Sequence, residues 1–176
     1  MNICVFGAAM PVAKAYITTT EDLGKTLGAQ GHTLVFGGFA NGLMQAIGDG
    51  FAHGGGKAIG IVPATITGRK VHPVCAKVLS VASLAERKQK MLELADAFVV
   101  LPGGIGTLDE LFEVLALKLI GTMHKPVIIF NAQGYYDTLL NNLQNMRNKG
   151  FIGLPLEQLF TVATTGQEVA RNFVSN

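Results

Sequence analysis

The stretch SLAERKQKMLELADAFVVLPGGIGTLDELFEVL, residues 83–115, decides the fold class of this 176-residue chain. Its first third has the spacing of an amphipathic helix, and Ser83 followed by Glu86 is typical of a helix N-terminus. The apolar run at 97–101 then predicts a buried strand, which Pro102 ends, and a glycine-rich turn leads into a second helix. Helix, strand and helix in this order predict a parallel sheet covered by helices.

The same alternation continues on both sides of this stretch. The predicted strands are 3–6, 33–36, 58–62, 77–81, 97–101, 126–130 and 159–163, and the predicted helices are about 11–30, 41–53, 83–95, 107–120, 135–149 and 166–174. Because the central runs are apolar almost throughout, we expect strands that are buried on both faces. The sequence therefore predicts a single α/β domain over residues 1–176, with a doubly wound, mostly parallel sheet of six or seven strands and helices on both faces.

Composition and charge exclude several classes of protein. Charged residues make up 15% of the chain and the net charge of +2 forms no block, which argues against disorder and against a nucleic-acid polymer as partner. No apolar run approaches the ~18 residues of a membrane span, so we expect no membrane partner. The two cysteines, Cys4 and Cys75, and the four scattered histidines lack metal-ligand spacing. We expect buried thiols, histidines at the surface or in loops, no metal and a cytoplasmic location.

Glycine is the outlier, at 22 of 176 residues. Most glycines are predicted to lie where strands end, among them Gly37 and Gly38 after the second strand and Gly103, Gly104 and Gly106 after the fifth. The carboxyl ends of parallel strands form the crevice in which α/β proteins bind ligands, and glycine lets backbone approach a ligand closely. The glycine excess therefore predicts a binding site at this edge of the sheet.

The turn from Gly103 to Thr107 leads into a helix whose first N–H groups have no intrahelical partners. Together with the helix dipole, these donors suit an anion, above all a phosphate. The alternative is a tight turn that only connects strand to helix. The dinucleotide fingerprint G-x-G-x-x-G is absent, because Asp109 stands where its third glycine should follow.

Glu110 also has two interpretations. Thr107 and Glu110 fit the capping box of a helix N-terminus. However, Asp109 and Glu110 lie beside the predicted phosphate site, where two carboxylates would repel the anion unless one has another task. A carboxylate one turn beyond a phosphate could face the sugar of a nucleotide and act as acid, base or cation stabiliser.

Two cations interrupt the apolar face of the helix at 83–95. This face consists of Leu84, Met91, Leu94 and Ala95. Arg87 and Lys88 fall inside the same arc, so either their stems cover the core while the charged heads reach water, or they point into a cleft and meet an anion or a carboxylate. Arg87 is better suited to a bidentate contact.

These residues resemble the signature of the cytokinin riboside 5′-monophosphate phosphoribohydrolases, the "Lonely guy" family formerly labelled lysine decarboxylases. The signature is an Arg-Lys pair followed by PGGxGTxxE, present here as Arg87-Lys88 and at residues 102–110. Two flanking stretches also resemble the family, VFGGFANGLMQAI at 35–47 and GTMHKPVIIFNAQGYYDTLLNNL at 121–143. Matches in this order are far more specific than a lone glycine motif.

The resemblance implies a Rossmann-like homodimer that hydrolyses the N-glycosidic bond of an N6-modified adenosine 5′-monophosphate, an AMP-like nucleotide, without a metal or redox cofactor. It makes Arg87 and Glu110 the catalytic pair, with their division of roles open. The residues that it places at the phosphate or close to the ligand are Gly103, Gly104, Ile105, Gly106, Thr107, Lys88, Gly37 and Gly38. The apolar face of helix 107–120, with Leu108, Leu111, Phe112, Leu115 and Leu119, exceeds what one crevice wall needs and is expected to contact a partner subunit.

The sequence departs from the family's pattern at Ala8-Ala9-Met10, Phe39, Thr65 and Ala116-Leu117. We expect these positions around the base and the ribose, so base preference and strength of activity stay open. Two rival functions remain: a broader nucleoside 5′-monophosphate nucleosidase, and a non-catalytic carrier of a nucleotide or of the molybdenum cofactor. The pair of Arg87 and Glu110, which a carrier would not need, favours an enzyme. No lysine stands in a recognisable Schiff-base context, which argues against a decarboxylase.

Overall fold

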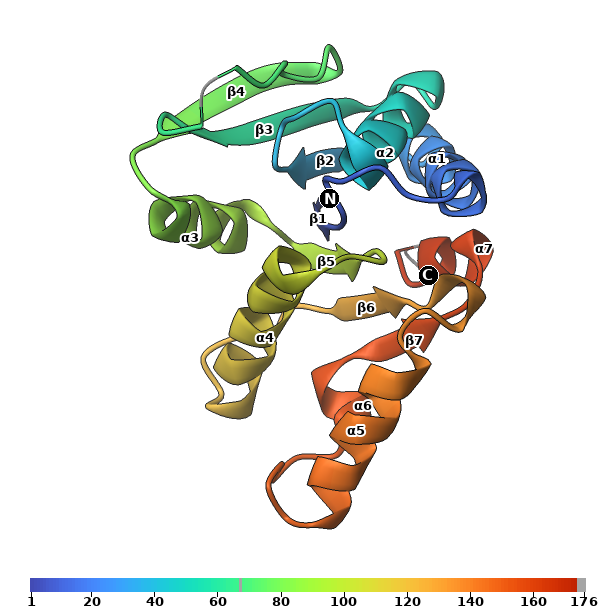
Figure 1. The fold of residues 1–176 in the computed structure, drawn as a ribbon, viewed down its shortest axis with the longest axis vertical. Coiled ribbons are helices and arrows are strands. Elements are labelled where there is room, and N and C mark those ends of the chain that lie inside the picture. The colour runs from blue at the N-terminus through green and yellow to red at the C-terminus, as the bar shows by residue number, and fades with distance from the viewer. Residues whose placement is uncertain (67, 174–176) are drawn as a thin grey trace.

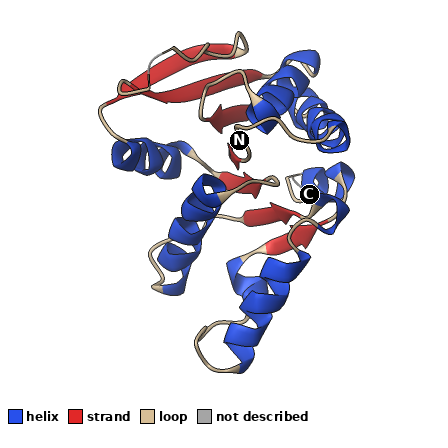
Figure 2. Ribbon diagram, viewed as in Figure 1, coloured by secondary structure: helices blue, strands red, loops and turns tan. Residues whose placement is uncertain are grey.

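The computed structural model describes residues 1–66 and 68–173, and its centre is one sheet of seven strands (Figures 1 and 2). The strands are β1 (Asn2–Phe6), β2 (Thr33–Phe36), β3 (Lys57–Pro63), β4 (Cys75–Val81), β5 (Ala97–Val100), β6 (Val127–Phe130) and β7 (Thr161–Ala163). Their order is β4-β3-β2-β1-β5-β6-β7, and every neighbouring pair is parallel. The chain winds outward from β1 in both directions, which confirms the predicted doubly wound sheet.

Helices cover both faces of the sheet, as predicted (Figure 1). They are α1 (Lys14–Ala29), α2 (Gly42–His53), α3 (Leu84–Leu94), α4 (Ile105–Leu119), α5 (Asp137–Asn148), α6 (Leu156–Leu159) and α7 (Gly166–Arg171), with a short 3-10 turn η1 (Ala132–Gly134). Buried side chains of α1, α2 and α7 share one core cluster, and those of α3 to α6 share the other. No helix in the described part of the chain is both long and apolar enough to cross a membrane.

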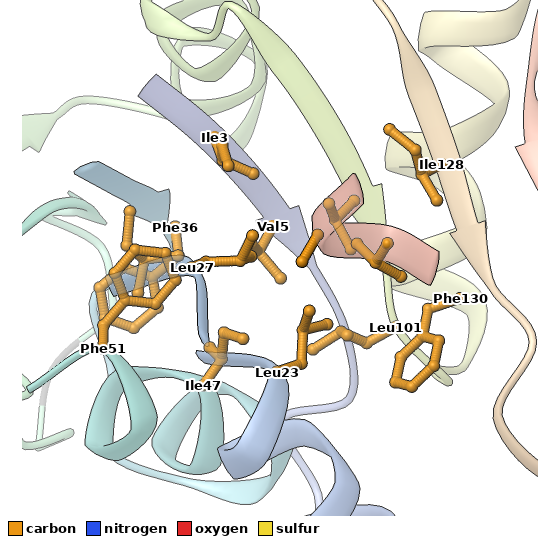
Figure 3. Packing of buried hydrophobic residues seen from close by; sticks show 14 of the residues in the cluster. Ile3, Val5, Leu23, Leu27, Phe36, Ile47, Phe51, Leu101, Ile128 and Phe130 are labelled. Carbon is orange, nitrogen blue, oxygen red and sulfur yellow. The ribbon is translucent and has the colours of Figure 1, made fainter. Parts of the chain in front are cut away.

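The strands contribute alternate residues to the two cores. In β1, Ile3 and Val5 pack toward α1 and α2, whereas Cys4 and Phe6 belong to the cluster on the opposite face. Figure 3 shows Ile3 and Val5 among the side chains of the first cluster. Because successive residues of a strand point to opposite faces, a strand with both faces covered must be apolar at every position. This is why the central runs read as continuous apolar segments.

The predicted bounds are wrong at two places. Helix α4 begins at Ile105, with Gly104 as its N-cap and no side-chain capping bond, so Thr107 lies inside the helix and the predicted capping box with Glu110 does not form. At 159–163, Leu159 ends the short helix α6 and only Thr161–Ala163 form the strand. A capping-box pattern predicts the start of a helix correctly only when no earlier residue can form the first helical turn.

The predicted N-terminus of α3 is confirmed. Ser83 Oγ accepts the Glu86 N–H at 3.1 Å, and the Glu86 carboxylate accepts the Ala82 N–H at 2.7 Å. The first bond satisfies a donor of the first turn of the helix, and the second ties Glu86 to the residue before the N-cap. They hold the start of the helix that carries Arg87.

Several glycines lie between helices α1 and α2 and not at strand ends. A Cβ on Gly24 would come within 2.6 Å of the Ile47 carbonyl oxygen, and one on Gly28 within 2.7 Å of that of Phe51. Glycine therefore lets the two helix backbones touch. The expectation that most glycines mark the carboxyl ends of strands is wrong for this group, because helix packing is invisible in local sequence.

Candidate active site

A cavity of about 530 Å³ opens at the carboxyl edge of the sheet. Its walls are the loops that follow β1, β2 and β5, together with residues of α3, the first turns of α4, and Arg69 from the β3–β4 connection. The strand order reverses at β1, so the loops after β1 and its neighbours diverge and leave a crevice. The predicted location of the binding site at this edge agrees with this geometry.

The N-terminus of α4 forms one end of the cavity. The first backbone bond of the helix runs from the Leu108 N–H to the Gly104 oxygen at 3.0 Å, which leaves the N–H groups of Ile105, Gly106 and Thr107 without intrahelical acceptors. A Cβ on Gly104 or Gly106 would point into open space. Ile105 is 89% exposed, so its side chain does not fill the space in front of the turn. This turn has the donors and the free space that a phosphate needs.

Two adjacent tyrosines form hydrogen bonds to the β5–α4 connection. The Tyr136 hydroxyl donates to the Leu101 oxygen at 2.7 Å, and the Tyr135 hydroxyl donates to the Gly103 oxygen at 3.0 Å. Tyr136 is buried, whereas Tyr135 is half exposed and lines the cavity. No local sequence pattern connects the two tyrosines with this loop, because nothing local shows that the segment after β6 returns to the loop after β5.

We expect Tyr136→Phe to lower the free energy of unfolding by about 1–2 kcal/mol, because it removes a buried hydrogen bond from the Leu101 carbonyl. Urea unfolding followed by circular dichroism measures this change. Tyr135→Phe is the matched control, and its effect should be smaller because water can replace the lost partner of a half-exposed group. An equal loss in both variants would contradict the role of burial.

Arg87 reaches the centre of the cavity from α3. Its Nε donates to the Ile61 oxygen of β3 at 3.0 Å, and its guanidinium lies so close to Gly37 that a Cβ there would overlap it. Burial lowers the pKa of Arg87, while the charge of Glu110 acts in the opposite direction. An arginine stays protonated at neutral pH in proteins, so this is a fixed positive charge inside the cavity.

Glu110 lies in the second turn of α4, just beyond the turn with free N–H groups. Burial raises the pKa of its carboxyl to about 7, against the opposing charge of Arg87. Among the described residues, no carboxylate oxygen of Glu110 lies within 4.0 Å of an Arg87 nitrogen. Both charges act on the pKa of the Cys4 thiol in β1, which burial raises most. A carboxyl that titrates near neutral pH can accept or hold a proton during a reaction.

The remaining acidic residues of α4 have a separate task. Lys88 Nζ lies 2.9 Å from an Asp109 oxygen and 2.8 Å from a Glu113 oxygen. Its hydrogen bonds to Glu113 and Asp109 raise the pKa of Lys88. This ion-pair cluster offsets the Asp109 charge that would otherwise repel a phosphate, and it ties α3 to α4. Lys88 lines the cavity, but its ammonium is already engaged by protein carboxylates.

The cavity wall includes some of the positions singled out in the sequence and leaves out others. Gly38 is not among the lining residues; its φ of +77° and the proximity of Val62 and Gly60 explain the glycine. Leu84, expected on the buried face of α3, is 58% exposed at the cavity rim. Of the positions that depart from the family's pattern, Ala8, Ala9, Met10 and Phe39 line the cavity. Thr65, Ala116 and Leu117 are not among its lining residues, and their place around the base and ribose stays a prediction.

Other residues of the wall were not predicted as site residues from sequence, among them Tyr16, Asn41 and Arg69. Each comes from a segment whose approach to the site depends on tertiary packing. His32 and His72 are buried, but both lie in loops, one of the two places expected for the histidines. Within residues 1–66 and 68–173, no three His, Cys, Asp or Glu side chains gather as a metal site would require.

The fold and the site together define a Rossmann-like α/β protein with a helix N-terminus whose first N–H groups are free, an arginine and a half-buried glutamate at its switch point. A model of the family described as "possible lysine decarboxylase" matches residues 44–173. A probable cytokinin riboside 5′-monophosphate phosphoribohydrolase of rice (Oryza sativa subsp. japonica) is 40% identical over 164 residues, 92% of this chain and 72% of the relative. A cytokinin riboside 5′-monophosphate phosphoribohydrolase of Arabidopsis thaliana is 36% identical over 172 residues, 97% and 80% of the two chains. The chain therefore belongs to the cytokinin riboside 5′-monophosphate phosphoribohydrolase family.

Solved structures share the fold at lower identity. A molybdenum cofactor binding protein from the phototrophic bacterium Rippkaea orientalis superposes with a TM-score of 0.75 at 21% identity, covering 99% of this chain and 97% of that one. The molybdenum cofactor carrier protein of Chlamydomonas reinhardtii gives a TM-score of 0.74 at 21% identity, over 97% and 94% of the two chains. At this identity the likeness confirms the Rossmann-like fold and says nothing of the ligand.

Proposed function

We propose that this protein is an N-glycosidase that hydrolyses N6-modified adenosine 5′-monophosphate to the free base and ribose 5-phosphate, the cytokinin-activating reaction. Family membership supports the reaction class. The observation that carries the proposal for this chain is Glu110, a half-buried carboxyl that lines the same cavity as Arg87 just beyond a helix N-terminus suited to phosphate, with its pKa raised to about 7 by desolvation. A 5′-phosphate on the α4 turn would bring the sugar next to Glu110.

Each group then has a task in hydrolysis. The free N–H groups of Ile105, Gly106 and Thr107 hold the phosphate and fix the position of the ribose. The Glu110 carboxylate activates or orients the attacking water, or stabilises positive charge on the sugar as the bond to the base breaks. Arg87, held by the Ile61 oxygen, favours the ionised form of Glu110 and offsets negative charge near the phosphorylated sugar.

Two alternatives correspond to specific features of the molecule. A broader nucleoside 5′-monophosphate nucleosidase would fit the altered wall at Ala8, Ala9, Met10 and Phe39. A carrier would fit the fold of the molybdenum cofactor proteins. A carrier has no use for a buried carboxyl beside the sugar, and burying one costs free energy, so Glu110 favours the hydrolase.

The test is to incubate the protein with adenosine 5′-monophosphate, with its N6-isopentenyl derivative and with N6-isopentenyladenosine, and to quantify free base by chromatography. We expect base from the two nucleotides and far less from the nucleoside, which lacks the phosphate for the α4 turn. If no nucleoside monophosphate yields base, the hydrolase is excluded. If pyrimidine nucleotides react as fast as purine nucleotides, the protein is a broader nucleoside 5′-monophosphate nucleosidase and not an enzyme specific for N6-modified AMP.

We further propose that the protein is a homodimer that acts in the cytoplasm. The free thiols of Cys4 and Cys75 suit a reducing compartment, and cell fractionation tests the location. Helix α4 supports the dimer because its outer face carries a row of exposed apolar side chains, namely Ile105, Phe112, Leu119 and Ile120. Leu111 and Leu115 instead belong to the core, so their predicted contact with a partner is wrong.

Phe112→Glu is expected to convert the dimer to a monomer, because it places a charge at the centre of this apolar row. Light scattering coupled to size-exclusion chromatography measures the mass. The matched control is Val78→Glu, a comparably exposed position on the edge strand β4, which should leave the mass unchanged. A Phe112→Glu variant with the mass of the wild-type dimer would exclude α4 as the interface, and a monomeric wild type would exclude the dimer.

A further inference from the structure

Arg69 is a charged residue of the cavity wall that the proposed reaction does not use. It comes from the connection between β3 and β4, and its guanidinium carbon lies 5.6 Å from the centre of the Phe39 ring, which also lines the cavity. Among the described residues, no carboxylate lies within 4.0 Å of its nitrogens. Its charge is close enough to Arg87 to lower the pKa of that guanidinium, although burial lowers it more.

The segment that carries Arg69 is attached to the loop after β2. Phe39 and Val71 form an antiparallel bridge, the Ala40 N–H donates to the Lys70 oxygen at 3.0 Å, and the His72 N–H donates to the Gly38 oxygen at 2.8 Å. His72 is buried, and its ring nitrogens contact the Val74 N–H at 3.1 Å and Asp49 at 3.2 Å. These bonds fix the backbone on both sides of Phe39. The backbone next to Arg69 therefore has a defined position at the cavity wall.

The order of the strands indicates which end of a bound nucleotide would lie near Arg69. Along the sheet the order is β3, β2, β1, β5 and β6 (Figure 1). The phosphate turn and Glu110 belong to α4, which follows β5, whereas Arg87 contacts the Ile61 oxygen of β3 and the loop at Gly37, and Phe39 and Arg69 come from the loops after β2 and β3 on the same side. A nucleotide with its phosphate on α4 and its glycosidic bond at Glu110 therefore extends its base toward Phe39 and Arg69.

A polar group at the same end also lacks a partner. Asn41 stands at the N-cap of α2 without a side-chain capping bond. Its Oδ1 is buried, has no hydrogen-bond partner within residues 1–66 and 68–173, and belongs to a residue of the cavity wall. A buried acceptor without a donor costs about 1–3 kcal/mol. A substituted N6 amino group carries one N–H, which is the donor that this oxygen lacks.

The charges of the cavity exceed what one phosphate requires. Lys88 is neutralised by Asp109 and Glu113, so the α4 N-terminus and Arg87 remain for the phosphate and Arg69 is left over. We propose that Arg69 binds a carboxylate on the N6 substituent of the base, so that the preferred substrate is an adenosine 5′-monophosphate whose N6 group is acidic. This inference rests on the proposed function, because it takes the base to lie where that reaction places it.

The test compares two ligands that differ only in charge, N6-carboxymethyl-AMP and its neutral amide, N6-carbamoylmethyl-AMP. Dissociation constants are measured by calorimetry in a Glu110→Gln background, so that binding does not depend on turnover. We expect the carboxylate to bind about tenfold more tightly than the amide. This ratio is at the lower end of the range for a charge-assisted hydrogen bond, because Arg69 is exposed to water. Adding Arg69→Met should bring the ratio near one, and the preference should weaken as salt rises.

Lys70→Met is the matched control, since Lys70 is the adjacent exposed cation but does not line the cavity. It should retain the tenfold ratio. Equal affinity for both ligands before Arg69 is replaced, or a ratio that survives Arg69→Met, would overturn the proposal. The proposed hydrolase fails by a different result, the absence of free base from the wild type, and the binding ratio can be read in either case.

Discussion

Glu110→Gln is expected to lower kcat for base release by about 10²- to 10⁴-fold, the range over which positioned acid or base groups act. Glutamine has the same size but cannot accept a proton or carry the negative charge that stabilises the sugar cation. KM should change little, since the phosphate is held by backbone N–H groups of α4. Steady-state rates from chromatography measure the effect.

The control for this variant is Glu93→Gln, an exposed carboxylate on α3 that pairs with Lys90 and lies outside the cavity wall. It should retain the wild-type rate within a factor of about two, as expected of a residue that contacts no reacting group. A Glu110→Gln variant that releases base at the rate of Glu93→Gln would remove Glu110 from the mechanism.

The pH dependence of stability gives a second readout of Glu110. Its pKa is raised from 4.5 to about 7, mainly by burial, so between these values the folded protein binds more protons than the unfolded chain. The contribution to stability is therefore largest below pH 4.5 and is lost as pH rises to about 7. Glu110→Gln should raise the free energy of unfolding by about 1–3 kcal/mol at pH 8 and by little at pH 5. Equal gains at both pH values would contradict the burial of an ionisable carboxyl.

Arg87→Met is expected to have the second largest effect, a fall in kcat/KM of about 10²-fold, as when one preorganised electrostatic contact is removed. It should also move the pH profile. The carboxylate form of Glu110 is the active form in the proposed reaction, so kcat/KM of the wild type should rise through about pH 7. The Arg87 charge opposes the raised pKa of Glu110, so removing it should shift this rise to higher pH.

Lys90→Met is the control for Arg87, because Lys90 is an exposed cation on the same helix. It should keep both the rate and the profile. A loss of activity in Arg87→Met with an unshifted profile would mean that Arg87 only supports the fold of α3, and an unchanged rate would exclude it from the reaction.

The architecture was predictable because its main strands and helices have recognisable local sequence patterns. A strand such as Ile3 to Phe6, buried on both faces, must be apolar at every position, and helices such as α1 and α4 are long enough to show their period. The central residues of the site were predictable for a related reason. Arg87 is a charge on a face that should be apolar, and Glu110 is a carboxylate beside a phosphate-type turn, so both stand out against their surroundings.

The features that sequence could not supply depend on contacts between distant segments. Arg69 reaches the cavity because Phe39 and Val71 bridge two loops, and Tyr136 supports Leu101 from 35 residues away. Thr107 has the pattern of a cap but lies inside α4, because the turn at Gly104 can begin the helix earlier. In each case the competing contact is made by residues that no local pattern connects.

The most direct test of the account is to count turnovers. The protein at 1 μM is incubated with N6-isopentenyl-AMP in large excess, and free base, ribose 5-phosphate and intact nucleotide are quantified over time. The account predicts base and ribose 5-phosphate in equal amounts, continuing well beyond one equivalent of enzyme, and almost none with Glu110→Gln. Nucleotide that stays bound and intact at one equivalent, with no base released, would contradict it and identify a carrier.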